Sequence, residues 1–148
     1  MPGTFIFRPI EAELHKVKGL IHKMDPYCRV KIGKHKSKSR VCKEGGVHPH
    51  WDDAIIVKRD HETTGVLKIK DNNLLNPHRK VGVSTIDLQE VEKEGQVNKW
   101  YPLYSKGIEQ GKVKVEITYT DCVLATQEVN LVDIKPHGEY NHCSSAKW

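Results

Sequence analysis

The 148-residue chain has no apolar run approaching the ~18 residues that a membrane-spanning helix needs. Its first residues, Met-Pro-Gly-Thr-Phe, also lack the basic and then apolar layout of a signal peptide. Its four cysteines form no Cys-x-x-Cys pair, and Cys28 and Cys42 fall at strand-like positions, which favours reduced thiols over disulfides or zinc. These absences predict a cytoplasmic protein.

Motifs of catalysis and of nucleotide binding are also missing. The sequence contains neither Gly-x-Ser-x-Gly nor His-Glu-x-x-His, and its Gly-rich turns are followed by neither Lys-Ser/Thr nor a helix. No aromatic residues alternate with its cations to stack on bases, and no long amphipathic helix is available to enter a groove. We therefore expect neither an enzyme nor a nucleic-acid-binding protein.

Positive charge, by contrast, is abundant and unevenly distributed. The chain has 24 Lys and Arg against 19 Asp and Glu, a formal net charge of +5. Seven of these 24 cations lie between Arg29 and Lys43, and no acidic residue interrupts the stretch from Pro26 to Lys43. Such a concentration predicts a surface that attracts an anionic partner.

The cations follow the period of a β-strand. In the segment Tyr27–Gly33, Cys28, Val30 and Ile32 alternate with polar residues, as in a strand with one buried face. In Lys36–Cys42 the cations again share one parity. The two segments are expected to form a hairpin whose cations point to the same side.

A tight turn centred on Lys34 and His35 is expected to join these strands. It would set two pairs of cations opposite one another: Lys31 with Lys38, and Arg29 with Arg40. Like charges that face each other across a sheet are destabilising. The hairpin is easier to explain if an anionic surface or ligand relieves this repulsion.

Short segments of alternating character recur along the chain, separated by turn residues, which indicates an all-β protein built as an antiparallel β-sandwich. Only Asp87–Glu94 looks helical. Residues 1–122 are expected to form the sandwich, and residues 123–148 an extension with one further strand and a flexible tail. The expected strands are Thr4–Arg8, Ile10–Val17, Tyr27–Gly33, Lys36–Cys42, Asp53–Arg59, Gly65–Lys70, Val81–Leu88, Lys99–Tyr104 and Lys112–Thr120.

Six short motifs, taken in order, resemble those of the C2 domain family over roughly residues 4–120. The resemblance implies an eight-stranded β-sandwich that docks signalling and trafficking proteins onto membranes. Because the match opens directly on the strand from Ile10 to Leu20, the second of the two circularly related topologies is favoured. The motifs include Val17-Lys18-Gly19-Leu20 leading to Asp25-Pro26-Tyr27, His48-Pro49-His50-Trp51, Leu67-Lys68-Ile69-Lys70-Asp71, and Trp100-Tyr101-Pro102-Leu103.

Family members that bind calcium use about five aspartates, and this chain keeps few of them. Asp25 and Asp71 match two of the positions, whereas Asn73 stands where another acid is expected and Arg79 takes the place of a later one. Two carboxylates beside cations bind calcium poorly. We expect no metal or other cofactor, and Arg79 is expected to supply part of the charge that a metal would bring.

The resemblance also places a lipid-binding site on the basic hairpin. It implies a calcium-independent, peripherally membrane-associated module that binds anionic phospholipid or phosphoinositide. The alternative is a protein-interaction adaptor that binds no lipid directly. The candidate lipid-binding residues are the hairpin cations, two leucines of the third loop and one arginine behind them: Arg29, Lys31, Lys34, Lys36, Lys38, Arg40, Leu74, Leu75 and Arg79.

Overall fold

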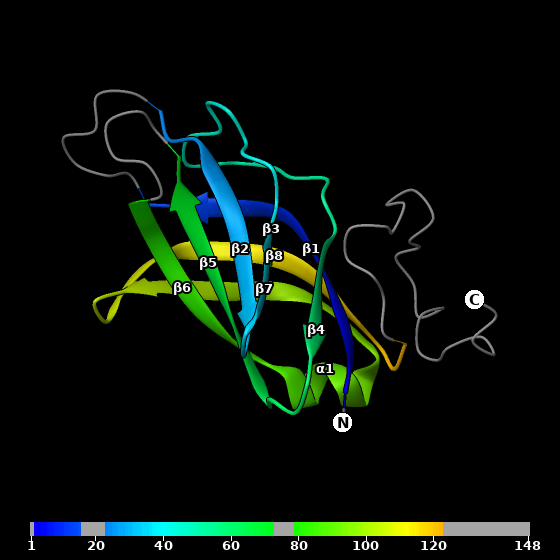
Figure 1. The fold of residues 1–148 in the computed structure, drawn as a ribbon. Helices are drawn as coiled ribbons and strands as arrows, with labels where there is room; N and C mark the ends of the chain where they lie inside the picture. Colours follow the sequence, from blue (N-terminus) through cyan, green and yellow to red (C-terminus); the bar gives the residue numbers. More distant parts are fainter. Residues whose placement is uncertain (1, 16–22, 73–78, 123–148) are drawn as a thin grey trace.

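The computed structural model describes residues 2–15, 23–72 and 79–122 (Figure 1). Eight strands and one helix lie within these ranges. The helix α1 has seven residues, too few to cross a bilayer. The elements are β1 (Gly3–Leu14), β2 (Pro26–Ile32), β3 (His35–Lys38), β4 (Ile55–Arg59), β5 (Thr64–Asp71), β6 (Arg79–Asp87), α1 (Leu88–Glu94), β7 (Gln96–Ser105) and β8 (Ile108–Thr120).

All strand pairs are antiparallel, and the strand order is β3-β2-β5-β6-β7-β8-β1-β4. The only ladder contact between β6 and β7 joins Val83 to Tyr104, so the sheet divides there into two layers. Figure 1 shows β2, β5 and β6 in front of β7, β8 and β1, and the edge strands β3 and β4 approach each other. The predicted all-β sandwich is confirmed.

The core lies between the two layers and follows from the alternation of the strands. In β8, Val113, Val115 and Ile117 are completely buried, as their period of two predicts. They join Phe5 and Phe7 of β1 and the inward residues of β2 and β5 in one apolar cluster. Because every second residue points inward, the intervening side chains of β2 and β5 are held on the outer surface.

The register predicted for the β2–β3 hairpin is wrong by two residues. Arg29 lies opposite Lys38, and Lys31 lies opposite Lys36. The turn consists of Gly33 and Lys34, because Gly33 adopts the positive φ of 59° that a two-residue turn with glycine in first position needs. Since the slip is an even number of residues, the cations still share one face.

Most strand boundaries also differ from the prediction, by one to four residues. The segments expected as two separate strands before residue 18 form one continuous strand, β1, with a bulge between Pro9 and Glu11. The bulge accommodates a proline that has no amide proton to donate to the ladder. The second strand of the basic hairpin ends at Lys38, four residues earlier than expected, and the predicted helix is present with Asp87 as its N-cap.

Cys28 and Cys42 are free thiols, as expected, and burial raises the pKa of the Cys28 thiol. The expectation of a reduced thiol is wrong for Cys122, which is disulfide-bonded. The proposed extension, residues 123–148, lies outside the described residues. So do Asn73, Leu74 and Leu75, whose expected roles stay predictions.

Candidate functional site

The outer surface of the β3-β2-β5-β6 layer carries seven cations, which we call the basic face. Strand β2 provides two of them, and each neighbouring strand adds more at positions of the same parity. Residues paired across antiparallel strands point to the same side, so the register alone brings these side chains together. The basic face consists of Arg29 and Lys31 on β2, Lys36 and Lys38 on β3, Lys68 and Lys70 on β5, and Lys80 on β6.

Cation lies opposite cation throughout this surface. Arg29 is paired in register with Lys38 on one side and with Lys68 on the other. Lys31 faces Lys36, and Lys70 faces Lys80. None of the ion pairs formed within the described ranges involves a cation of the basic face. The face is therefore an uncompensated positive surface, which an anion would stabilise.

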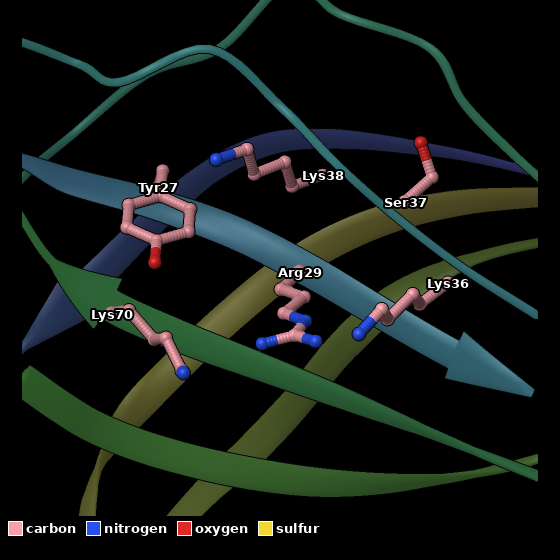
Figure 2. Close-up of a pocket in the computed structure, with 6 residues that line it drawn as sticks. All are labelled: Tyr27, Arg29, Lys36, Ser37, Lys38 and Lys70. Atoms are coloured by element: carbon pink, nitrogen blue, oxygen red, sulfur yellow. The ribbon is translucent and has the colours of Figure 1, made fainter. Parts of the chain in front are cut away.

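At the centre of the basic face is an open hollow of about 560 Å³. Figure 2 shows the Arg29 guanidinium between the amino groups of Lys70 and Lys36, all directed into the same space. The Lys38 Nζ atom lies 5.5 Å from the centre of the Tyr27 ring, a cation–π contact. Tyr27 thus lines one side of the hollow, next to Lys38. The hollow is lined by Tyr27, Arg29, Lys36, Ser37, Lys38 and Lys70.

The crowding of charge perturbs Lys70 in particular. Partial burial lowers the pKa of Lys70, and the neighbouring cations lower it further: Arg29, Lys68, Lys80 and Lys38. Burial also raises the pKa of the Tyr27 hydroxyl, an effect that Arg29 partly offsets. The protein therefore disfavours the charged form of Lys70, and an anion bound in the hollow would reverse that effect.

This repulsion predicts that Lys70→Gln stabilises the fold while weakening anion binding. Removing one of several facing like charges is expected to raise the free energy of unfolding by about 0.5 kcal/mol. Urea denaturation measures the change, and Lys58→Gln on β4, outside the basic face, is the control. A Lys70→Gln protein less stable than the wild type would contradict the picture of an uncompensated charge.

Two hairpin residues predicted to bind lipid lie outside the paired strands of the basic face, and Arg40 lines a neighbouring hollow with Tyr27 and Lys38. Lys34 is in the turn, and Arg40 follows the end of β3. The Arg40 guanidinium lies 3.2 Å from Asp53, and the Arg40 backbone N–H donates to the same carboxylate at 2.6 Å. Asp53 therefore neutralises Arg40 and fixes the chain where it leaves β3.

Lys68, Lys70 and Lys80 belong to the basic face but were missed by the sequence interpretation. Lys68 and Lys70 alternate with the buried Leu67 and Ile69, which is the same signal that identified the cations of β2. That alternation shows that they point outward. Only the pairing of β2 with β5 shows that they lie beside Arg29.

The residues that match calcium-ligand positions are engaged with protein groups. The Asp71 carboxylate, fully buried, accepts the Asp25 backbone N–H at 2.8 Å and lies 3.1 Å from the Arg79 guanidinium. Asp25 Oδ1 accepts the backbone N–H of Glu44 at 2.6 Å. Within the described ranges, no three His, Cys, Asp or Glu side chains gather around a potential metal position. Both carboxylates are thus held by protein donors, and the expectation that the chain binds no calcium stays a prediction.

The sequence is similar to known proteins over most of its length. A family model described as C2 domain matches residues 4–103. Elicitor-responsive protein 3 of Oryza sativa subsp. japonica is 28% identical over 99 residues, covering 66% of this chain and 69% of that protein. Ingression protein fic1 of Schizosaccharomyces pombe is 23% identical over 120 residues, covering 79% of this chain and 44% of that protein.

Solved structures show the same architecture. A C2 domain-containing protein from an elicitor-responsive gene has a TM-score of 0.70 at 23% identity, covering 84% of this chain and 93% of that one. A C2 domain of a plant Extended Synaptotagmin 1 has a TM-score of 0.68 at 18% identity, with coverages of 82% and 97%. A calcium-bound pair of C2 domains from Extended-Synaptotagmin 2 has a TM-score of 0.67 at 28% identity, with coverages of 80% and 46%.

Proposed function

The chain belongs to the C2 domain family, and on that premise we propose that it is a non-enzymatic module that attaches to anionic membranes through the basic face without calcium. C2 domains commonly bind membrane phospholipids. The observation that carries the proposal is the basic face itself, where cation lies opposite cation on four neighbouring strands. Such repulsion weakens a sheet unless an anionic surface compensates it.

The number of cations is sufficient for reversible attachment. Each basic residue close to an anionic leaflet contributes ~1 kcal/mol, so even four or five cations in contact give useful affinity. The attraction is screened within about 10 Å at 0.1 M salt, and binding should therefore fall as salt rises. The hollow favours a phosphorylated headgroup, because the planar guanidinium of Arg29 binds phosphate oxygens in pairs and the lysines add charge around it.

The calcium-independent character of the proposed binding is supported by the Asp71–Arg79 ion pair. Calcium attracts anionic lipid by adding positive charge at the end of a sandwich. Here the Arg79 guanidinium lies 3.1 Å from the buried Asp71 carboxylate and neutralises a carboxylate that calcium would otherwise have to bind. We therefore do not infer calcium binding by this chain from the calcium-bound structure of Extended-Synaptotagmin 2.

Vesicle sedimentation tests the proposed function. The protein is mixed with vesicles of phosphatidylcholine alone, with added phosphatidylserine, or with added phosphoinositide, in calcium or in chelator. It is expected to sediment only with the anionic vesicles, equally in calcium and chelator, and to be released when salt rises from about 0.1 M to several times that value. Recovery in every supernatant would overturn the proposal and favour a protein-interaction adaptor. Binding that requires calcium would overturn its calcium-independent part.

A further inference from the structure

The tip of the β7–β8 hairpin exposes two large apolar side chains. Tyr104 is 46% exposed and Ile108 is 65% exposed, and they are the large apolar residues most open to solvent within the described ranges. The turn between them is formed by Lys106 and Gly107, with positive φ angles of 52° and 77°. These angles are typical of a tight two-residue hairpin turn, so the tip is narrow and well defined.

Register connects this tip to the basic face. Arg29 pairs with Lys68, Lys68 pairs with Val83, and Val83 pairs with Tyr104. Because cross-strand partners point to the same side, Tyr104 continues the outer surface that carries the cations. Figure 1 shows the β7–β8 hairpin extending past the first residues of β6. The apolar tip and the basic face therefore border one another.

The tip also projects from the end of the sandwich. Gly111 on β8 pairs with Leu14, the last residue of β1, and the His15 N–H donates to the Gln110 carbonyl at 2.9 Å, so residues 104–109 lie beyond the last described contact with that segment. Ser105 pairs with Ile108 and Tyr104 pairs with Glu109, which places Ile108 and Tyr104 on opposite sides of the ribbon. Apart from Gly107 and its two chain neighbours, no heavy atom of the described residues lies within 4 Å of the position that a Cβ on Gly107 would take. If this tip entered a lipid layer first, both apolar side chains would contact the lipid.

We propose that residues 104–108 form an apolar anchor that enters the headgroup region of the same membrane that the basic face attracts. This inference rests on the proposed function. A membrane suits the tip better than a protein groove, because Lys106 between the apolar residues can contact lipid phosphates while Tyr104 and Ile108 reach the acyl boundary. Tyrosine in particular combines an apolar ring with a hydroxyl that stays hydrated at an interface.

Tryptophan fluorescence tests the insertion directly. Ile108→Trp places a reporter at the tip, and Gln89→Trp places one at an exposed position on α1, outside the basic face. With phosphatidylserine vesicles that carry brominated acyl chains, the emission added by Ile108→Trp is expected to shift to the blue and to be quenched. The emission added by Gln89→Trp is expected to stay unchanged, and the three native tryptophans are common to both proteins.

Affinity gives a second readout. The double variant Tyr104→Ser/Ile108→Ser should bind phosphatidylserine vesicles about 10-fold more weakly, while its unfolding midpoint stays unchanged because both side chains are exposed. A wild-type protein that sediments while the Ile108→Trp emission stays unquenched overturns the anchor alone. A wild-type protein that ignores anionic vesicles overturns both the anchor and the proposed function.

Discussion

Replacing Lys31, Lys36 and Lys38 together by glutamine is expected to weaken binding to phosphatidylserine vesicles about 100-fold, since each cation near an anionic leaflet contributes ~1 kcal/mol. All three side chains are exposed, and each lies opposite another cation of the basic face. The substitutions therefore remove repulsion and leave the core intact. Sedimentation over a range of lipid concentrations measures the loss, and the salt dependence of the remaining binding should become shallower.

A matched variant separates the basic face from net charge. Lys58, Lys93 and Lys114 lie on β4, α1 and β8, outside the basic face, and their replacement by glutamine removes the same three charges. This control is expected to bind vesicles within about 3-fold of the wild type, because its lysines do not contact the leaflet together. If vesicle binding were weakened equally in the two triple variants, the attraction would depend on the net charge of the whole protein and not on the basic face.

The comparison of these surfaces shows what local sequence periodicity can and cannot predict. The alternation in Tyr27–Gly33 correctly predicted a strand with outward cations, because the period of side chains in a strand is fixed by the backbone. The turn was misplaced because the expectation weighed the cations and neglected Gly33, whose positive φ sets the loop. The resulting register error of two residues changed the partners but preserved the face.

The rest of the basic face depends on pairing between distant segments. Arg29 and Lys68 are far apart in sequence, and the outward alternation of Lys68 and Lys70 does not reveal which strand lies beside β5. Arg40 illustrates the opposite case, since its parity matched the other cations but β3 ends at Lys38 and the Arg40 guanidinium is paired with Asp53. Local patterns thus assign inside and outside, whereas long-range contacts decide which outward charges act together.

The ion pair at the end of the sandwich leads to the second large effect: Arg79→Ala is expected to lower the free energy of unfolding by about 2–3 kcal/mol. Asp71 is completely buried, whereas the Arg79 side chain is 25% exposed. Removing the guanidinium leaves a buried carboxylate with less compensation, which costs far more than the loss of a surface pair. Urea denaturation measures the change, and Lys80→Ala on the same strand is the control, expected to be neutral or slightly stabilising.

A double-mutant cycle with Asp71→Ala isolates the interaction, because removing both partners leaves no unpaired charge. The double variant should be less destabilised than the sum of the two single variants. If the guanidinium replaces a metal, calcium should leave the melting temperature of the wild type unchanged and raise that of Arg79→Ala at high concentration, since the Asp71 carboxylate then lacks its guanidinium partner. Additive losses of unfolding free energy in the two single variants would contradict a direct interaction between Arg79 and Asp71. Stabilisation of the wild type by calcium would contradict the replacement of a metal by Arg79. Unaltered vesicle binding by Arg79→Ala would show that Arg79 contributes to stability and not to membrane binding.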